Sequence, residues 1–259
     1  MAAPEIKETI YTGLVLDFET GGLNTKDNCA TQLCAKMIRF DTFEVIGIFN
    51  EYFYPFHKAK VKTVKKAIKK KTEIVEDEEE SNELFEYTEG ALTKTGITME
   101  MLYSKGIDIK TLGKEFVQFL EETKICNAKD CKPFLIGQNI TFDVQFFLQF
   151  MEYAGIEKEV RKFLAGDEMF YNGTTMWVPK YHDTLPYNRA VFCTNPNVRG
   201  YTLGNLCEAY GVENDDAHNA LYDVNVTKDI FEIGVKRARN DGGEIEVEKQ
   251  IKTRTHFKI

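Results

Sequence analysis

Two acidic side chains stand close together at the end of an apolar run near the start of the chain. Asp17 and Glu19 follow residues 13–16 and are separated by one aromatic residue, Phe18. On a β-strand, residues two positions apart point to the same face, so both carboxylates would face the same way. Two buried carboxylates repel each other, and their burial is costly unless a cation lies between them. The pair therefore indicates a site for a divalent metal ion.

A third acid, Asp143, lies among phenylalanines in a segment with helical periodicity, residues 140–155. Phe146 and Phe147 follow it by three and four residues, so Asp143 shares their face of the helix. An acid on the apolar side of a helix needs a partner. The alternative is that Asp143 caps the helix by accepting backbone N–H groups near its first turn.

A fourth acid, Asp223, raises the same question in the segment 219–239, and His218 precedes it by five residues. On one continuous helix the two side chains would diverge by about 140°. They converge only if His218 belongs to the preceding loop, which the residues "ENDDAHN" at 213–219 favour. A lone histidine is more often structural, but four acids and one histidine at element ends favour a catalytic set.

The hydrophobic pattern predicts an α/β fold with a mixed sheet, in which an antiparallel meander is joined by parallel strands and flanked by helices. Strands are expected over residues 10–19, 30–40, 44–54, 132–139 and 180–186, the last stopped by Pro186. Helices are expected over 109–124, 140–155, 157–164, 202–211 and 219–239. We also expect Trp177, in the aromatic-rich stretch 169–177, to pack in the core or in a lid, with base stacking as the alternative.

One segment departs from this pattern. Eight lysines lie between positions 58 and 71, and nine acids with no basic residue lie between 73 and 89. We interpret residues 57–86 as a solvated insertion, and the alternative is that the lysines contact a phosphate backbone. The expected organisation is one domain over 1–240 and a C-terminal tail over 241–259. A faint likeness of that tail to a sliding-clamp-binding peptide is less favoured than a plain tail.

Composition narrows the function classes. The chain has 259 residues, of which 43% are hydrophobic, so it is not a disordered chain. Its net charge of −8 argues against a passive nucleic-acid coat, but not against an enzyme that binds phosphates through metal ions. The six cysteines form no Cys-x-x-Cys pair, which favours reduced, buried thiols over zinc or disulfides. No apolar run of about 18 residues occurs, so we expect a soluble, cytoplasmic protein.

Three short segments, taken together and in order, resemble a known family. "LDFETGGL", "GQNITFDVQFF" and "AHNALYDV" are similar to the three motifs of the DEDDh, or DnaQ-like, 3′→5′ exonucleases. "EGALTKTGITMEML" resembles the segment that joins the first two motifs in that family. The resemblance covers about residues 11–236 apart from the insertion. It is closest to the proofreading epsilon subunit of bacterial DNA polymerase III and its phage-borne or stand-alone relatives.

The resemblance implies a ribonuclease H-like fold and a two-metal-ion phosphodiester hydrolase that uses Mg²⁺ or Mn²⁺ and releases nucleoside 5′-monophosphates. It also implies roles for individual residues. Asp17 would bridge both ions, Glu19 and Asp223 would complete the nucleophile-side site, Asp143 would hold the other ion, and His218 would act as general base. Thr20 and Leu23 would lie beside the terminal nucleotide, and Asn139 and Phe142 would shape its pocket.

Two positions depart from the family pattern: Gly21 lacks a hydroxyl, and Gln138 stands where a histidine often precedes the asparagine. Neither is an expected metal ligand. The implied partners are a single-stranded or frayed 3′ end of DNA and, as a candidate, a replicative polymerase, in proofreading, replication or repair. The main alternative is an RNA-trimming exoribonuclease of the same superfamily. A catalytically inactive nucleic-acid-binding domain is disfavoured because no acid of the set is lost.

Overall fold

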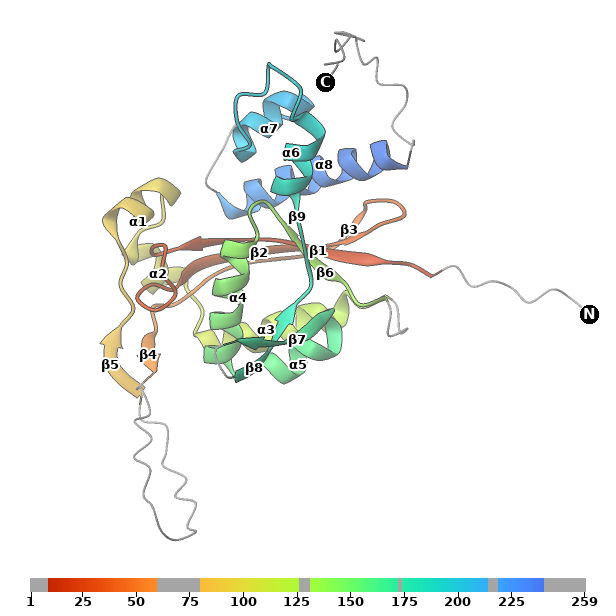
Figure 1. Cartoon of the computed structure of the whole chain (residues 1–259). Helices are drawn as coiled ribbons and strands as arrows, with labels where there is room; N and C mark the ends of the chain where they lie inside the picture. The colour runs from red at the N-terminus through yellow and green to blue at the C-terminus, as the bar shows by residue number, and fades with distance from the viewer. Residues whose placement is uncertain (1–8, 60–79, 126–130, 172–173, 214–218, 240–259) are drawn as a thin grey trace, which may run out of the picture.

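A five-stranded mixed sheet forms the centre of the fold in the computed structural model, which describes residues 9–59, 80–125, 131–171, 174–213 and 219–239 (Figure 1). The strand order is β3-β2-β1-β6-β9. The strands are β1 (Thr12–Thr20), β2 (Ala30–Arg39), β3 (Val45–Tyr52), β6 (Phe134–Gly137) and β9 (Tyr181–Asp183). β1, β2 and β3 form an antiparallel meander, and β6 runs parallel to both β1 and β9. The predicted fold class is therefore confirmed.

Helices cover both faces of the sheet, which explains why β1 is apolar on both sides. On one face, α3 (Ile109–Glu122) packs against β3 and α4 (Thr141–Ala154) packs against β1. On the other face, α8 (Ala220–Ala238) crosses β1 and β2. Leu14, Leu16 and Phe18 join the first core, whereas Val15 packs with Val224 of α8 in the second. Strand alternation therefore turns Asp17 and Glu19 toward the α8 face, like Val15.

The predicted helices begin and end close to their expected positions. α3, α4, α5 (Glu157–Phe163), α7 (Leu203–Tyr210) and α8 are all present. The backbone at Gly155 and Gly211 has φ of 73° and 70°, which favours glycine, and these residues end α4 and α7. Asn219 caps α8 by accepting the N–H of Leu221.

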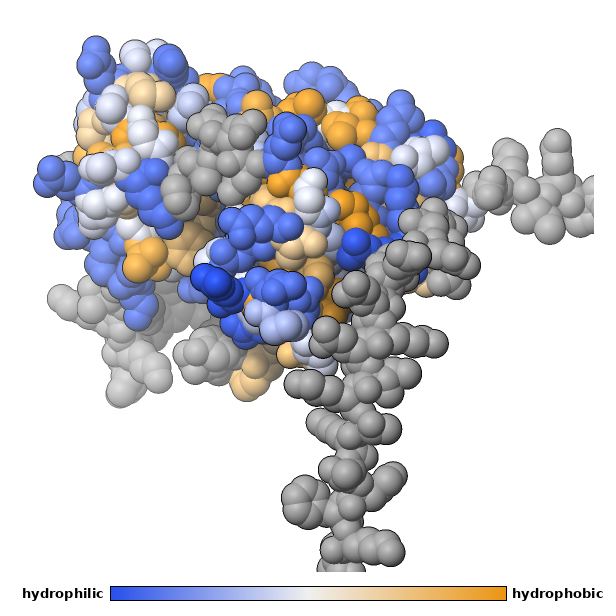
Figure 2. All heavy atoms as spheres, turned by 90° about the horizontal axis from the view of Figure 1, so that it is seen from above, coloured by the Kyte–Doolittle hydropathy of each residue, from blue (hydrophilic) through white to orange (hydrophobic). Residues whose placement is uncertain are grey.

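A satellite core joins the last helices. Phe192 of α6 (Thr184–Phe192), Leu206 of α7 and Ile230 of α8 pack together beside the main sheet. Seen from above, the α6–α8 side has hydrophilic and hydrophobic residues interspersed over its surface (Figure 2).

Several elements were not predicted. They are α1 (Glu89–Thr95), α2 (Met99–Lys105), α6, and the strand pairs β4 (His57–Ala59) with β5 (Glu80–Leu84) and β7 (Gly166–Tyr171) with β8 (Thr174–Pro179). Pro186 was expected to stop a strand, but that strand already ends at Asp183, which caps α6. Pro186 lies in the first turn of α6, where a helix does not need the missing N–H.

Both ends of the predicted insertion, 57–86, contain strands of the fold, so any solvated segment is shorter than predicted. β4 and β5 pair in antiparallel fashion around it. Phe56 and Phe85 are buried in the main core with their ring centroids 5.2 Å apart. Residues 60–79, most of the insertion, lie outside the described residues, as does the predicted tail 241–259. The domain boundaries stay predictions.

Two smaller expectations concern individual side chains. Trp177 is buried in the main core, where a Cβ on Gly166 would come within 2.1 Å of its ring. Core packing is therefore its role in the fold. The described cysteines are all free thiols, and only Cys193 among them is exposed, while Cys126 lies outside the described residues. No helix among the described residues is long and apolar enough to cross a membrane.

Candidate active site

Three of the four predicted acids converge at one end of the sheet. Asp17 and Glu19 come from the last residues of β1, and Asp223 comes from the first turn of α8. One carboxylate oxygen from each lies within 4.8 Å of the others, and we call these three residues the carboxylate cluster. The cluster forms because β1 turns two acids toward the face that the start of α8 covers.

Asp143 lies beside the cluster but not within it. It is the third residue of α4, only 4% exposed, and its Oδ1 accepts the backbone N–H of Phe18 at 3.0 Å. The cap position of α4 belongs to Ile140, which makes no side-chain cap bond. The partner of Asp143 is therefore the backbone of β1, so α4 is tied to the strand that carries Asp17 and Glu19.

These acids are electrostatically unfavourable in the absence of a cation. Burial, followed by repulsion from Asp143, Glu19 and Asp223, raises the pKa of Asp17 well above its usual range. Burial and the charge of Asp223 raise the pKa of Glu19 to about 7. Lys94 of α1 lowers the pKa of both groups, but as a smaller influence.

The pKa of Asp143 is likewise raised by burial, and the N–H of Phe18 opposes this rise. A divalent cation among these carboxylates would remove the repulsion, and hard oxygen donors are the ligands that Mg²⁺ and Mn²⁺ prefer. The donor set therefore fits the predicted ions.

The predicted substrate-contact residues lie around the same end of the sheet. β1 and β6 are parallel, so Thr20 at the end of β1 and Asn139 just after β6 share one edge. Thr20 is buried and its hydroxyl donates to the carbonyl of Gly22 at 2.7 Å, whereas Leu23 is 85% exposed. Phe142 is half-buried against Phe146, with the ring centroids 5.0 Å apart.

Asp183 supports this edge and was missed at the sequence level. Its Oδ1 accepts the N–H of Asn139 and the N–H of Leu185, each at 2.9 Å. Asn139 has φ of 56°, an uncommon left-handed conformation for a residue other than glycine, and the Asp183 bond helps to hold it there. The available signal was an aspartate, a preferred N-cap residue, followed within one turn by a proline, which the first turn of a helix tolerates.

Gln138, which departs from the family pattern, also has a structural role. Its Nε2 donates to the carbonyl of Tyr201 at 2.7 Å, and its Oε1 accepts the hydroxyl of Thr184. Gln138 therefore links the end of β6 to α6 and to the segment before α7. This link could not be inferred from sequence, because its partners are 46 and 63 residues away.

His218 lies outside the described residues, so its place in the site stays a prediction. Asn219 is the N-cap of α8, and the helix begins at Ala220. Asp223 is therefore in the first turn of this helix, and its cluster with Asp17 and Glu19 does not depend on where His218 lies.

Comparison with solved structures supports the fold. Escherichia coli exonuclease I in its zinc-bound complex with single-stranded DNA is 20% identical, with a TM-score of 0.59, over 89% of this chain and 41% of that one. The same enzyme with a dT13 oligonucleotide is 18% identical, with a TM-score of 0.60, over 89% and 42%. The chain thus spans about two fifths of exonuclease I, and neither structure tests the finer resemblance to the epsilon subunit.

Comparison with family models gives the family. No curated protein sequence matches the chain significantly. A family model described as RNase_T, Exonuclease, matches residues 83–231. Asp143 and Asp223 fall inside this match. Asp17 and Glu19 precede it in the chain, but the fold places them beside Asp223. The match covers more than half of the chain, so the chain belongs to the RNase_T exonuclease family.

Proposed function

We propose that this chain is a metal-dependent 3′→5′ exonuclease that releases nucleoside 5′-monophosphates from the 3′ ends of DNA. The observation that carries the proposal is the carboxylate cluster, in which Asp17, Glu19 and Asp223 lie within 4.8 Å of one another in an exonuclease-family chain. Half-buried acids held this close together are costly for the fold, so the cluster favours a role in binding cations.

The carboxylates would hold two Mg²⁺ or Mn²⁺ ions. In this assignment Asp17, Glu19 and Asp223 would hold one ion, and Asp17 and Asp143 would hold the other. Bound ions of this kind stabilise the charge that develops on the attacking and leaving oxygens of a phosphodiester. The N–H of Phe18 would help to orient Asp143 for metal binding, because it donates to one oxygen of the carboxylate, with 3.0 Å between nitrogen and oxygen.

His218 would take the proton from the attacking water. Its unperturbed pKa near 6.5 suits a general base at neutral pH. Around the terminal nucleotide, Leu23 would contact the base from the exposed side, and Thr20, Asn139 and Phe142 would shape the pocket. The backbone bond from Asn139 to Asp183 would hold the pocket in place before the substrate arrives.

The proposed substrate is a single-stranded or frayed 3′ end. The terminal nucleotide has to leave its partner strand to bring one phosphodiester to the carboxylates, and unpairing costs a few kcal/mol for a matched end. The two similar structures are complexes of exonuclease I with single-stranded DNA, which supports DNA over RNA as the proposed substrate. A replicative polymerase is a further proposed partner, on the resemblance to the epsilon subunit alone.

A gel assay with 5′-labelled and 3′-labelled oligomers tests this proposal. We expect a descending ladder from the 5′-labelled single strand, immediate release of labelled mononucleotide from the 3′-labelled strand, and no reaction in EDTA. A mismatched duplex end should be degraded faster than a matched one. Degradation in EDTA, or shortening from the 5′ end, would contradict the proposal. RNA degraded faster than DNA of the same sequence would instead favour the exoribonuclease alternative.

A further inference from the structure

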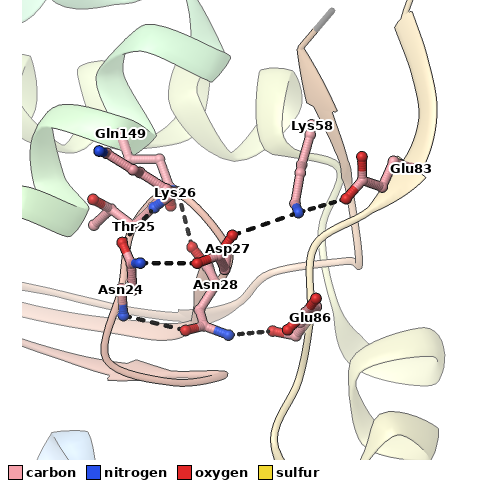
Figure 3. A network of polar contacts seen from close by, with 9 residues as sticks. All are labelled: Asn24, Thr25, Lys26, Asp27, Asn28, Lys58, Glu83, Glu86 and Gln149. Carbon is pink, nitrogen blue, oxygen red and sulfur yellow. Dashed lines mark hydrogen bonds and ion pairs between the residues drawn. The ribbon is translucent and has the colours of Figure 1, made fainter.

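The loop between β1 and β2 is held in a defined shape by polar contacts (Figure 3). We call residues 21–28 the Leu23 loop. Its base is closed by the N–H of Gly21, which donates to the carbonyl of Cys29 at 2.9 Å. Inside the loop, the N–H of Asn28 donates to the carbonyl of Asn24 at 2.7 Å.

Gln149 reaches this loop from α4. Its side chain is 6% exposed, and its Nε2 donates to the carbonyls of Thr25 at 2.6 Å and Asn28 at 3.0 Å (Figure 3). A glutamine side chain has two N–H donors, so these two bonds use both of them. The two bonds connect positions more than 120 residues apart in the chain.

Asn28 holds the loop from its other side. Its Oδ1 accepts the N–H of Asn24 at 3.2 Å, and its Nδ2 donates to the carbonyl of Glu86 at 3.0 Å. Gly22 lies directly over this amide, since a Cβ there would come within 2.4 Å of the Asn28 side chain. The loop is therefore fixed both to α4 and to the segment that precedes α1.

The ion pairs at the edge of the network contribute little by comparison. Lys58 Nζ lies 2.6 Å from Glu83 and 3.9 Å from Asp27, but both carboxylates are more than half exposed. Exposed pairs of this kind typically stabilise a protein by less than about 1 kcal/mol. The buried amides of Gln149 and Asn28 thus carry most of the constraint.

The loop presents one large apolar side chain to solvent. Leu23 is 85% exposed although the residues on either side of it are fixed. An apolar group on a preorganised loop binds a planar partner without first losing the freedom of a mobile segment. The helix that fixes this loop is also the one that carries Asp143, so α4 sets the place of both features.

We propose that Gln149 is a positioning residue that preorganises Leu23 for contact with the terminal base, an assignment that rests on the proposed exonuclease function. Gln149 does not touch the substrate. It acts through the carbonyls of Thr25 and Asn28, and its loss would loosen the Leu23 loop while leaving the carboxylate cluster in place.

A double-mutant cycle with Gln149→Met and Leu23→Ala tests this role. Methionine keeps the shape of glutamine and removes both donors. We expect Gln149→Met to raise KM for a single-stranded DNA oligomer roughly tenfold with little change in kcat, because uniform binding is lost. In the Leu23→Ala background, Gln149→Met should add almost nothing, since coupled residues are not additive.

Two matched controls separate positioning from general damage to the fold. Gln145→Met makes the same change at an exposed site one turn earlier on α4, and Glu83→Gln removes the charge that pairs with Lys58 at the edge of the network. Both should leave KM within about twofold of the parent. If Gln149→Met does not unfold cooperatively, Gln149→Leu, which also removes both donors to the carbonyls of Thr25 and Asn28, replaces it in the same cycle with the same expected result.

Additive effects in the cycle, or an unchanged KM in the single variant, would overturn the inference while the exonuclease function stands. A wild-type chain that leaves the oligomer intact would overturn the proposed function itself, and the inference with it.

Discussion

Two neighbouring regions at the end of β1, the carboxylate cluster and the Leu23 loop, differ in how their polar groups are paired. In the carboxylate cluster, half-buried acids lie close to one another, and desolvation and repulsion raise the pKa values of Asp17 and Glu19. In the Leu23 loop, the buried amides of Asn28 and Gln149 are hydrogen-bonded to backbone groups. The first region lowers stability until a cation binds, whereas the second adds stability and order from the start. Repulsion between acids is therefore a feature of the region proposed to bind cations, and satisfied hydrogen bonds are a feature of the loop proposed to hold Leu23 in place.

The largest expected effect comes from removing the central charge of the cluster. Asp17→Asn should lower the turnover of single-stranded DNA by several orders of magnitude, because Asp17 is proposed to bridge both ions. Steady-state rates with Mg²⁺ and with Mn²⁺ measure this loss. Asp167→Asn, a change of the same chemistry at an exposed site on β7, is the control and should retain the wild-type rate. An Asp17→Asn variant with undiminished nuclease activity would refute the assignment of this site.

The next effect concerns the proposed general base. His218→Ala should lose about 10²–10⁴-fold in kcat, the usual contribution of general-base catalysis, while still binding metal. Its pH–rate profile should also lose the acid limb near the ordinary histidine pKa of about 6.5. His57→Ala, at an exposed histidine on β4, is the matched control. A His218→Ala profile that coincides with the wild-type profile would show that another group accepts the proton.

A smaller effect should appear in the pH dependence of metal-free stability. Glu19 has its pKa raised from 4.5 to about 7 in the fold, so the folded chain keeps a proton that the unfolded chain releases. Stability from this group is therefore fully present below about pH 4.5 and falls as the pH rises toward 7. Thermal unfolding in EDTA should show this decline, and Glu19→Gln should flatten it. Glu121→Gln, on the exposed side of α3, should keep the wild-type slope.

The smallest effect is expected from excising residues 60–79. A short Gly/Ser link from β4 to β5 should change the free energy of unfolding by less than about 1 kcal/mol, because closure cost depends weakly on loop length. Phe85→Ala, just beyond the same hairpin, should instead cost about 3–5 kcal/mol, because Phe85 is buried in the core. Denaturant unfolding compares the two. A strongly destabilised excision variant would show that the segment packs against the domain.

Much of this arrangement follows from local sequence pattern. Alternation along β1 turns Asp17 and Glu19 to one face, and Gly155 marks the end of α4 where the helical period stops. These two features depend on residues a few positions apart, so periodicity and capping rules predict them. The acid among the phenylalanines of α4 indicated only that Asp143 needs a partner, and the partner, the N–H of Phe18, is 125 residues away in the chain.

Other features depend on contacts that the local pattern does not encode. Asp183 resembles the end of a strand until Asn139, 44 residues earlier, is seen to donate to it. Gln149 resembles an ordinary polar position of α4, because its partners on the Leu23 loop lie more than 120 residues away. α1 and α2 have only seven residues each, too short for a clear helical period. Their capping residues Thr88 and Thr98 were the remaining signal.

The central claim is that the carboxylate cluster is a cation site, and thermal unfolding with and without Mn²⁺ tests it most directly, in the absence of nucleic acid. At pH 7.5 the wild-type melting temperature should rise with Mn²⁺ concentration, because an ion that binds only the folded chain stabilises it. In EDTA, Asp17→Asn should melt a few degrees above the wild type, since the fold no longer has to hold an acid whose pKa is raised by burial and repulsion. Its response to Mn²⁺ should be largely lost. Equal Mn²⁺ responses in the two proteins, or an Asp17→Asn variant less stable than wild type in EDTA, would contradict the account.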